Sequence, residues 1–285
     1  MNVSVAEPTL LIRREKRPGR RFLRHLFKAI AMEPPLRDAI WILLYLLPAP
    51  IRWKALWGAT KMAQYLVGVL AAADQASREG VEAISVIEFG VASGEGLRLL
   101  EKHAEAVEKA TGVRIAVYGF DTGSGLPAPI GDYRDHPDVW QPGEFQMDYS
   151  SLAAKLTSRT RLVLGNVKTT VPQFVAEGAA PRVGFISFDL DFYSSTREAL
   201  KVLSLPGKHT LSRVFLYFDD INNYWSHSYA GERLAIREFN EANESIKIDR
   251  WFDVNLWRPF QEQQPRLRQM FIAHDLEAIK KSRVQ

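Results

Sequence analysis

Four carboxylates stand at the ends of two apolar runs in the second half of the chain. They are Asp189, Asp191, Asp219 and Asp220. Carboxylates held a few ångströms apart repel one another unless their pKa values rise or a cation lies between them. Oxygen ligands suit hard cations, and the chain has no cysteine that would favour zinc. The pattern therefore predicts a site for Mg²⁺ or Mn²⁺.

A cation held in this way lowers the pKa of a bound hydroxyl group, and a nearby carboxylate can then accept the proton. In this scheme the cation ligands are Asp189, Asp219 and Asp220, and the catalytic residues are Asp189 and Asp191, with Asp191 as the general base. The alternative is that some of these acids cap helices or pair with arginines such as Arg197.

A glycine loop follows an earlier apolar run that ends in Glu88. Gly90, Gly94 and Gly96 have the spacing Gly-x-x-x-Gly-x-Gly, and glycine lets a backbone approach a ligand closely. This spacing differs from the Gly-x-Gly-x-x-Gly of dinucleotide-binding folds. The loop predicts a binding site for a small cofactor, although a tight turn without a ligand also needs glycine.

A second acidic residue, Asp121, ends the next apolar run and is followed by Thr122. A carboxylate at the tip of the second strand of a nucleotide-binding sheet can accept both hydrogen bonds from a ribose diol. Aspartate is also common in turns, which is the alternative role for Asp121.

Short apolar runs alternate with helical segments from about residue 83 onward, the pattern of βα units in a mostly parallel sheet. The expected strands are 84–89, 115–121, 161–164, 183–189, 214–219, 246–254 and 269–273. Seven strands with the last one antiparallel predict an α/β, doubly wound, Rossmann-like fold. The strand ends would bring the acidic residues and the glycine loop to one edge of the sheet.

The chain divides into three predicted parts: a flexible basic arm over 1–19, a helical cap over 20–78 and the sheet domain over 79–285. Prolines at 34–35 and 48–50 break the cap into three helical stretches. Residues 20–32 form an amphipathic basic stretch, which packs on the fold or a partner subunit, as in a homodimer, or contacts a membrane surface.

Composition limits the possible partners and compartments. The segment 13–28 carries eight positive charges and one negative charge, a net +7 against a total of +4, so the rest of the chain has −3. An acidic main body argues against nucleic-acid binding. The apolar run at 39–51 falls short of the roughly 20 residues that a spanning helix needs. We therefore expect a cytoplasmic protein.

The ordered set of motifs resembles the macrocin O-methyltransferase family. It comprises Glu88-Phe89-Gly90, Gly119-Phe120-Asp121, Gly125-Leu126-Pro127, Asp189-Leu190-Asp191 and Asp219-Asp220. The resemblance implies a class I methyltransferase sheet, S-adenosylmethionine as cofactor, and Mg²⁺-dependent methylation of a sugar hydroxyl.

The resemblance also implies roles for individual residues. Cofactor contacts are expected at Glu88, Gly90 and Asp121, and by analogy Asn166 lies near the adenine. The acceptor is expected to be a sugar or another polyhydroxylated small molecule. Two alternatives remain on the same fold: a non-catalytic S-adenosylmethionine-binding regulator, and a metal-dependent relative similar to the cephalosporin hydroxylases.

Overall fold

A computed structural model describes residues 33–207, 209–254, 258 and 264–281 of the chain. The predicted arm at 1–19 and the basic stretch at 20–32 lie outside these residues. No helix of the described ranges is both long and apolar enough to cross a membrane.

Seven strands form one sheet. They are β1 (Ala83–Phe89), β2 (Arg114–Asp121), β3 (Thr160–Leu164), β4 (Arg182–Phe188), β5 (Thr210–Phe218), β6 (Ile246–Arg250) and β7 (Met270–Asp275). The order is β3-β2-β1-β4-β5-β7-β6, and β7 runs antiparallel to both β5 and β6. The strand order confirms the predicted Rossmann-like, seven-stranded methyltransferase sheet.

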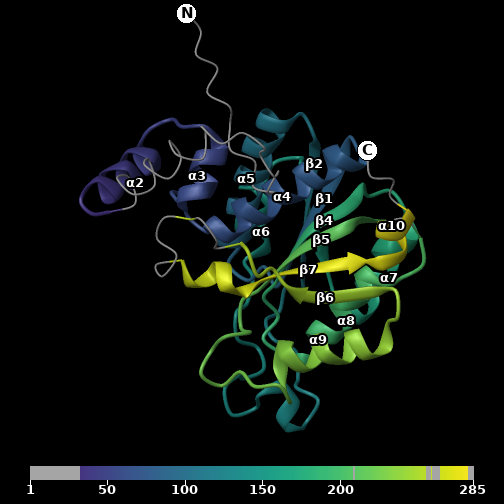
Figure 1. Cartoon of the computed structure of the whole chain (residues 1–285). Helices are drawn as coiled ribbons and strands as arrows, with labels where there is room; N and C mark the ends of the chain where they lie inside the picture. Colours follow the sequence, from purple (N-terminus) through teal and green to yellow (C-terminus); the bar gives the residue numbers. More distant parts are fainter. Residues whose placement is uncertain (1–32, 208, 255–257, 259–263, 282–285) are drawn as a thin grey trace, which may run out of the picture.

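Helices cover both faces of this sheet (Figure 1). On one face α4 (Ala63–Glu79) and α5 (Glu95–Thr111) bury Val86, Val117 and Phe215. The opposite face, which carries Ile87 and Phe120, is covered by α7 (Val167–Glu177), α8 (Tyr193–Leu200) and α9 (Gly231–Ala242). Apolar residues on both faces explain why the central strands read as nearly continuous apolar runs.

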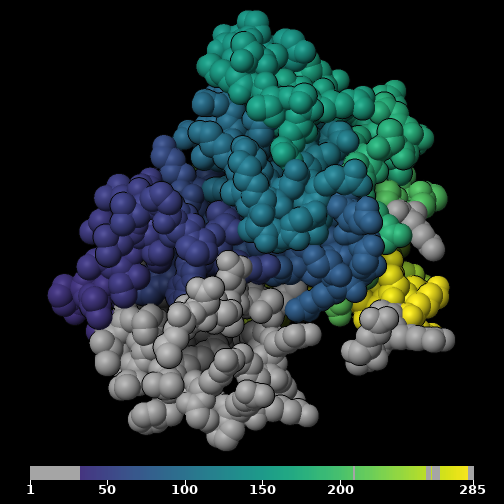
Figure 2. Space-filling model, turned by 90° about the horizontal axis from the view of Figure 1, so that it is seen from above, coloured from purple at the N-terminus to yellow at the C-terminus, as the bar shows by residue number. Residues whose placement is uncertain are grey.

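The segment that the sequence assigns to a helical cap has two parts in the structure. Helices α2 (Leu36–Leu46) and α3 (Ile51–Trp57) lie at one side of the molecule, coloured purple in Figure 2. In contrast, α4 packs directly on β4 and β5. A Cβ atom on Gly68 would lie 2.2 Å from the Phe185 ring, so glycine is needed for this close approach.

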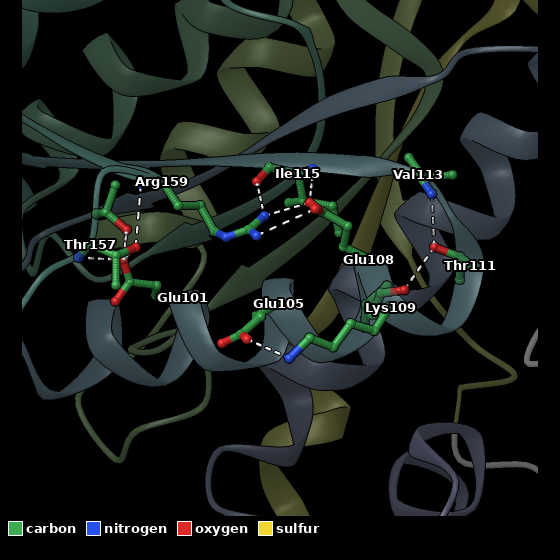
Figure 3. A network of polar contacts seen from close by, with 11 residues as sticks. Glu101, Glu105, Glu108, Lys109, Thr111, Val113, Ile115, Thr157 and Arg159 are labelled. Atoms are coloured by element: carbon green, nitrogen blue, oxygen red, sulfur yellow. Dashed lines mark hydrogen bonds and ion pairs between the residues drawn. The ribbon is translucent and has the colours of Figure 1, made fainter.

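Polar side chains attach α5 to the segment before β3 (Figure 3). Glu108 accepts hydrogen bonds from the backbone N–H of Ile115 and from the guanidinium of Arg159. Two turns earlier in the helix, Glu101 accepts hydrogen bonds from Thr157 and Thr160. These contacts fix the outer face of α5 while its glycine-loop end faces the strand termini.

The order of the strands places β1 next to β4, where the chain switches from building one side of the sheet to building the other. Ligands bind beyond the carboxyl ends of strands at such a switch point. The two strand ends are very close here, because a Cβ on Gly90 would lie 1.7 Å from the carbonyl oxygen of Asp189. The residues after β1 and β4 therefore share one site.

Candidate active site

The glycine loop turns sharply between β1 and α5. Gly90 and Gly94 have φ values of +83° and +81°, in the left-handed region that favours glycine. Gly96 has another reason for its size, because a Cβ there would lie 2.2 Å from Oε1 of Glu88. The missing side chain at Gly96 leaves room for the Glu88 carboxyl group.

Glu88 is buried at the end of β1, with 2% of its surface exposed. Its Oε1 accepts a 2.6 Å hydrogen bond from the hydroxyl of Tyr65, and that hydroxyl in turn accepts one from Ser187. Its Oε2 is buried and has no hydrogen-bond partner among the described residues. Burial raises the pKa of Glu88 well above its usual range, and the Tyr65 hydrogen bond opposes that shift.

Asp121, at the end of β2, binds the glycine loop. One carboxylate oxygen accepts hydrogen bonds from the backbone N–H groups of Val91 and Ala92, at 2.8 and 2.9 Å. The other accepts one from Gly123 at 2.6 Å. A carboxylate has about four acceptor positions, so this geometry leaves room for one further donor.

A cavity of about 1000 Å³, counted with its opening to solvent, lies between the glycine loop and the ends of β2 and β4. It brings together most residues that the sequence predicts for the site: Glu88, Gly90, Gly96, Asp121, Thr122, Asn166, Asp189 and Asp191.

Three predicted cofactor residues have local roles. Gly94 is not among the residues that line the cavity, and its α-carbon faces Leu152. Thr122 donates a hydrogen bond to the carbonyl of Gly125, which holds the loop after β2. Asn166 caps the start of α7 by accepting the N–H of Lys168.

Asp189, Asp191 and Asp220 form a group in which one oxygen from each lies within 4.8 Å of the others, a spacing that can hold a metal ion. Burial raises the pKa of Asp191 to about 9, and the neighbouring Asp220 adds to the shift. Burial also raises the pKa of Asp220, to about 6. Buried acids with these pKa values indicate uncompensated negative charge.

Asp191 also has an unusual backbone conformation. Its φ is +60°, which is uncommon for any residue other than glycine, although aspartate tolerates it better than most. This turn directs the chain from the end of β4 into α8 and leaves Asp191 only 8% exposed. Strained backbone of this kind is frequent at functional sites.

Asp219 lies outside this group of three. Its carboxylate accepts the hydroxyl of Tyr217, and Oδ1 lies 3.8 Å from the guanidinium of Arg266. Asp219 and Asp220 directly follow Phe218, the last residue of β5, and they have different partners. Asn223 donates a 2.6 Å hydrogen bond to Asp220. The four acids at the strand ends are thus divided between two environments.

Two loops extend beyond this edge of the sheet, 122–148 in teal and 219–230 in green (Figure 1). Asp135 anchors the first loop, because its fully buried carboxylate accepts hydrogen bonds from Ile130 and from the N–H and hydroxyl of Ser194. The loops meet at His136 and His227, whose rings are 5.4 Å apart.

Sequence reasoning missed Tyr65 and Glu232, which both reach the strand ends from helices. Tyr65 was placed in the predicted cap, and its contact with Glu88 joins residues that are distant in the chain. Glu232 reads in the sequence as an ordinary charged residue at the start of a helix, but it is only 3% exposed. The only sequence feature that could have drawn attention to Glu232 is its position directly after Gly231, in the segment that follows Asp220.

Comparisons with known proteins give structural similarities only. No protein-family model and no curated protein matches the sequence. The crystal structure of CalS11, a calicheamicin methyltransferase, is similar over 73% of this chain and 85% of that chain, with 24% identity and a TM-score of 0.48.

Two further solved structures are similar. MycE, a methyltransferase of the mycinamycin pathway in complex with Mg, SAH and mycinamycin VI, has 11% identity and a TM-score of 0.38, over 72% of this chain and 54% of that chain. The plantazolicin methyltransferase BpumL with SAH has 13% identity and a TM-score of 0.37, over 90% and 98%. At such scores the fold assignment rests on the strand order of the sheet.

Proposed function

We propose that this protein is an S-adenosylmethionine-dependent, divalent-metal-assisted O-methyltransferase that acts on a hydroxyl of a sugar or another polyhydroxylated small molecule. The observation that carries the proposal is the buried carboxyl group of Glu88 at the wall of the main cavity. Its Oε2 has no hydrogen-bond partner among the described residues, although burying such a group costs free energy.

A cationic ligand would compensate Glu88. S-adenosylmethionine carries an ammonium group and a sulfonium, and the glycine loop next to Glu88 leaves the backbone open to a ligand of this size. Asp121, at the other side of the loop, retains acceptor capacity for a ribose hydroxyl. The cavity thus offers an acceptor to each polar end of this cofactor.

The carboxylates after β4 and β5 fit a divalent cation. Magnesium is usually held by one or two carboxylates together with water and substrate oxygens. In our proposal Asp189 and Asp220 supply the carboxylates. Asp219, the third ligand that the family resemblance implies, already uses Oδ1 for its contacts with Tyr217 and Arg266. A bound cation would lower the pKa of a coordinated acceptor hydroxyl.

Asp191 then has the position of the general base. It lines the main cavity and belongs to the same group as Asp189 and Asp220, so it can accept a proton from a hydroxyl held there. The strained backbone at Asp191 fixes where its carboxylate stands. In this proposal Asp191 accepts the proton, while Asp189 and Asp220 bind the cation.

Aromatic side chains near the carboxylates suit a sugar-like acceptor. Trp140 packs edge-on against both Phe145, which lines the cavity, and Trp225 of the second loop, at ring distances of 5.9 and 5.6 Å. The indole N–H of Trp140 is buried and lacks a hydrogen-bond partner among the described residues. Flat apolar rings with a free donor match a ligand that has apolar faces and hydroxyl edges.

The proposal is tested first by calorimetric titration of the whole protein with S-adenosylmethionine, with and without Mg²⁺. Wild type is compared with Glu88→Gln, which removes the charge and keeps the shape, and with the exposed Glu105→Gln on α5 as control. We expect Glu88→Gln to bind about tenfold more weakly or worse, because a hydrogen bond to a charged group contributes roughly 1.5–3 kcal/mol.

Transfer of a labelled methyl group to hydroxylated acceptors, with and without chelator, then tests the reaction. A folded wild-type protein that binds no S-adenosylmethionine would overturn the proposal. Binding without transfer to any acceptor would favour the regulator, and oxidation of an acceptor with the cofactor's methyl group retained would favour the hydroxylase-like alternative.

A further inference from the structure

Glu232 is a buried acid that the reaction described above does not use. It lies in the first turn of α9 with 3% of its surface exposed. Both of its carboxylate oxygens are buried and have no hydrogen-bond partner among the described residues. Burial raises the pKa of Glu232 well above its usual range, and the nearby Asp220 raises it further. A carboxyl group with two unpartnered oxygens needs compensation from outside the described side chains.

The cationic side chain that follows Glu232 in the helix has other partners. Arg233 follows Glu232 in the helix and lines the same small cavity, but its guanidinium donates to the carbonyl of Ile221 and to the side chain of Asn222. His136 also lines this cavity, and burial lowers its pKa, so the ring favours its neutral form. Neither residue neutralises Glu232.

The small cavity connects Glu232 to the carboxylates of the proposed cation site. Asp191, Asp220 and Glu232 all line it. Of these, Asp191 also faces the main cavity, so the two spaces share a wall. Glu232 does not belong to the group of three acids that are close enough for direct ligation. The acidic side chains on the wall of this cavity supply the polar partners that an ordered water needs.

We propose that Glu232 is a positioning residue of the cation site, which accepts hydrogen bonds from water bound to the divalent ion beside Asp220. Magnesium keeps several of its waters when it binds to proteins, and these waters need acceptors. Partners of this kind hold the coordination sphere in place. Without the ion, the same carboxyl group only adds repulsion to Asp191 and Asp220.

This inference rests on the proposed function, because it requires a divalent ion in the site. The test uses Glu232→Gln in the whole protein, with Glu241→Gln on the same helix as the matched control, since Glu241 is exposed and pairs with Arg237. Mn²⁺ affinity is measured by calorimetry and by the loss of the free-ion paramagnetic resonance signal. Thermal unfolding is measured with excess chelator.

We expect Glu232→Gln to weaken Mn²⁺ binding about tenfold or more, within the range known for residues that support metal ligands. In chelator the same variant should unfold at a higher temperature than wild type, because the uncompensated acid is gone. Glu241→Gln should change neither quantity. A purely structural role for Glu232 would not produce opposite effects on metal affinity and metal-free stability.

Equal Mn²⁺ affinity of wild type and Glu232→Gln would overturn the inference and leave the proposed function intact. No Mn²⁺ binding by folded wild type would instead remove the metal from the proposed function, and the inference with it. If Glu232→Gln does not fold, Glu232→Asp takes its place. Withdrawing the carboxylate by one methylene should also weaken Mn²⁺ binding, and an unchanged affinity would count against the role.

Discussion

The hydroxyl of Tyr65 donates a 2.6 Å hydrogen bond to Oε1 of Glu88, which joins the first turn of the sheet-covering helix α4 to the end of β1. This hydroxyl also accepts a hydrogen bond from Ser187 at 2.9 Å. Both residues of the pair are buried, with 1% and 2% of their surfaces exposed. The position of the Glu88 carboxyl group therefore depends on how α4 packs.

Tyr65→Phe should lower both stability and cofactor affinity. The change leaves Oε1 of Glu88 without a donor, at a cost of about 1–3 kcal/mol in the free energy of unfolding. It also favours the protonated form of Glu88, which attracts a cationic ligand less. Chemical denaturation and titration with S-adenosylmethionine measure the two effects, with the half-exposed Tyr149→Phe as control. Unchanged affinity in Tyr65→Phe would show that Glu88 does not bind the cofactor's charge.

Gly96→Ala should weaken cofactor binding without a matching loss of stability. Alanine is favoured over glycine inside a helix by roughly 0.5–1 kcal/mol, but its Cβ would lie 2.2 Å from Oε1 of Glu88 and displace that group. Gly112→Ala is the opposite control, because φ there is +78° and no atom lies within 4 Å of the added Cβ. We expect Gly112→Ala to lose stability and keep its affinity. Full affinity in Gly96→Ala would contradict the placement of the ligand.

Asp220→Asn and Asp219→Asn should differ in Mn²⁺ binding. Asp220 belongs to the group of three acids, so its loss should weaken binding about tenfold or more, while Asp219→Asn should change affinity less than about threefold. Calorimetry with Mn²⁺ measures both variants. Equal losses would place Asp219 among the ligands, as the family resemblance implies.

Asp191→Asn should bind the metal but lose methyl transfer.

The pH dependence of stability should report on His103. Its ring is buried and donates a hydrogen bond from Nε2 to the carbonyl of Lys61 at 3.0 Å. Burial lowers its pKa from 6.5, so the folded state favours the neutral ring. Its contribution to stability is complete above pH 6.5 and is lost as the pH falls toward the lowered value.

His103→Gln removes this titration and keeps a donor. Wild type should therefore lose more stability than His103→Gln between pH 7 and 5, by at most about 1.4 kcal/mol per pH unit. Urea unfolding at several pH values measures the difference. Parallel curves for the two proteins would rule out His103 as the titrating group.

Glu108→Gln should destabilise the protein by about 1–3 kcal/mol, because Glu108 joins Arg159 to the start of β2. Arg159 holds the pKa of Glu108 below its usual range, consistent with an ionised pair. Glu105→Gln removes a solvent-exposed pair with Lys109 on the same helix and should change stability by less than about 1 kcal/mol. Similar effects for both variants would contradict a specific role of the partly buried Glu108 network.

The sheet could be predicted from the sequence because each central strand is buried on both faces and ends in a distinctive residue. The predicted strand at 84–89 and the structure's Ala83–Phe89 differ by one residue. The strand predicted at 246–254 ends at Arg250, because the backbone turns after it and buries Trp251 and Val254 in the core. Apolar residues in a turn are easily taken for a longer strand.

The site could be predicted only where it is built from strand ends. Asp189 and Asp220 can be predicted as site residues from their positions at strand ends. The different role of Asp219 depends on its hydrogen bond with Tyr217, which the sequence does not indicate. Tyr65 and Glu232 reach the strand ends through packing between helices and the sheet. Such contacts join residues that are far apart in the sequence, so no local pattern indicates them.

The close contact between Gly90 and Asp189 marks a part of the protein that does not tolerate substitution, in contrast to the loops beyond it. The glycine loop and Asp189 follow two adjacent strands, and there is no space for a side chain between Gly90 and Asp189. The two loops at 122–148 and 219–230 lie beyond that junction (Figure 1). Randomised libraries confined to these loops should therefore yield folded catalysts with altered acceptor preference, whereas diversity at the junction should yield mostly inactive protein.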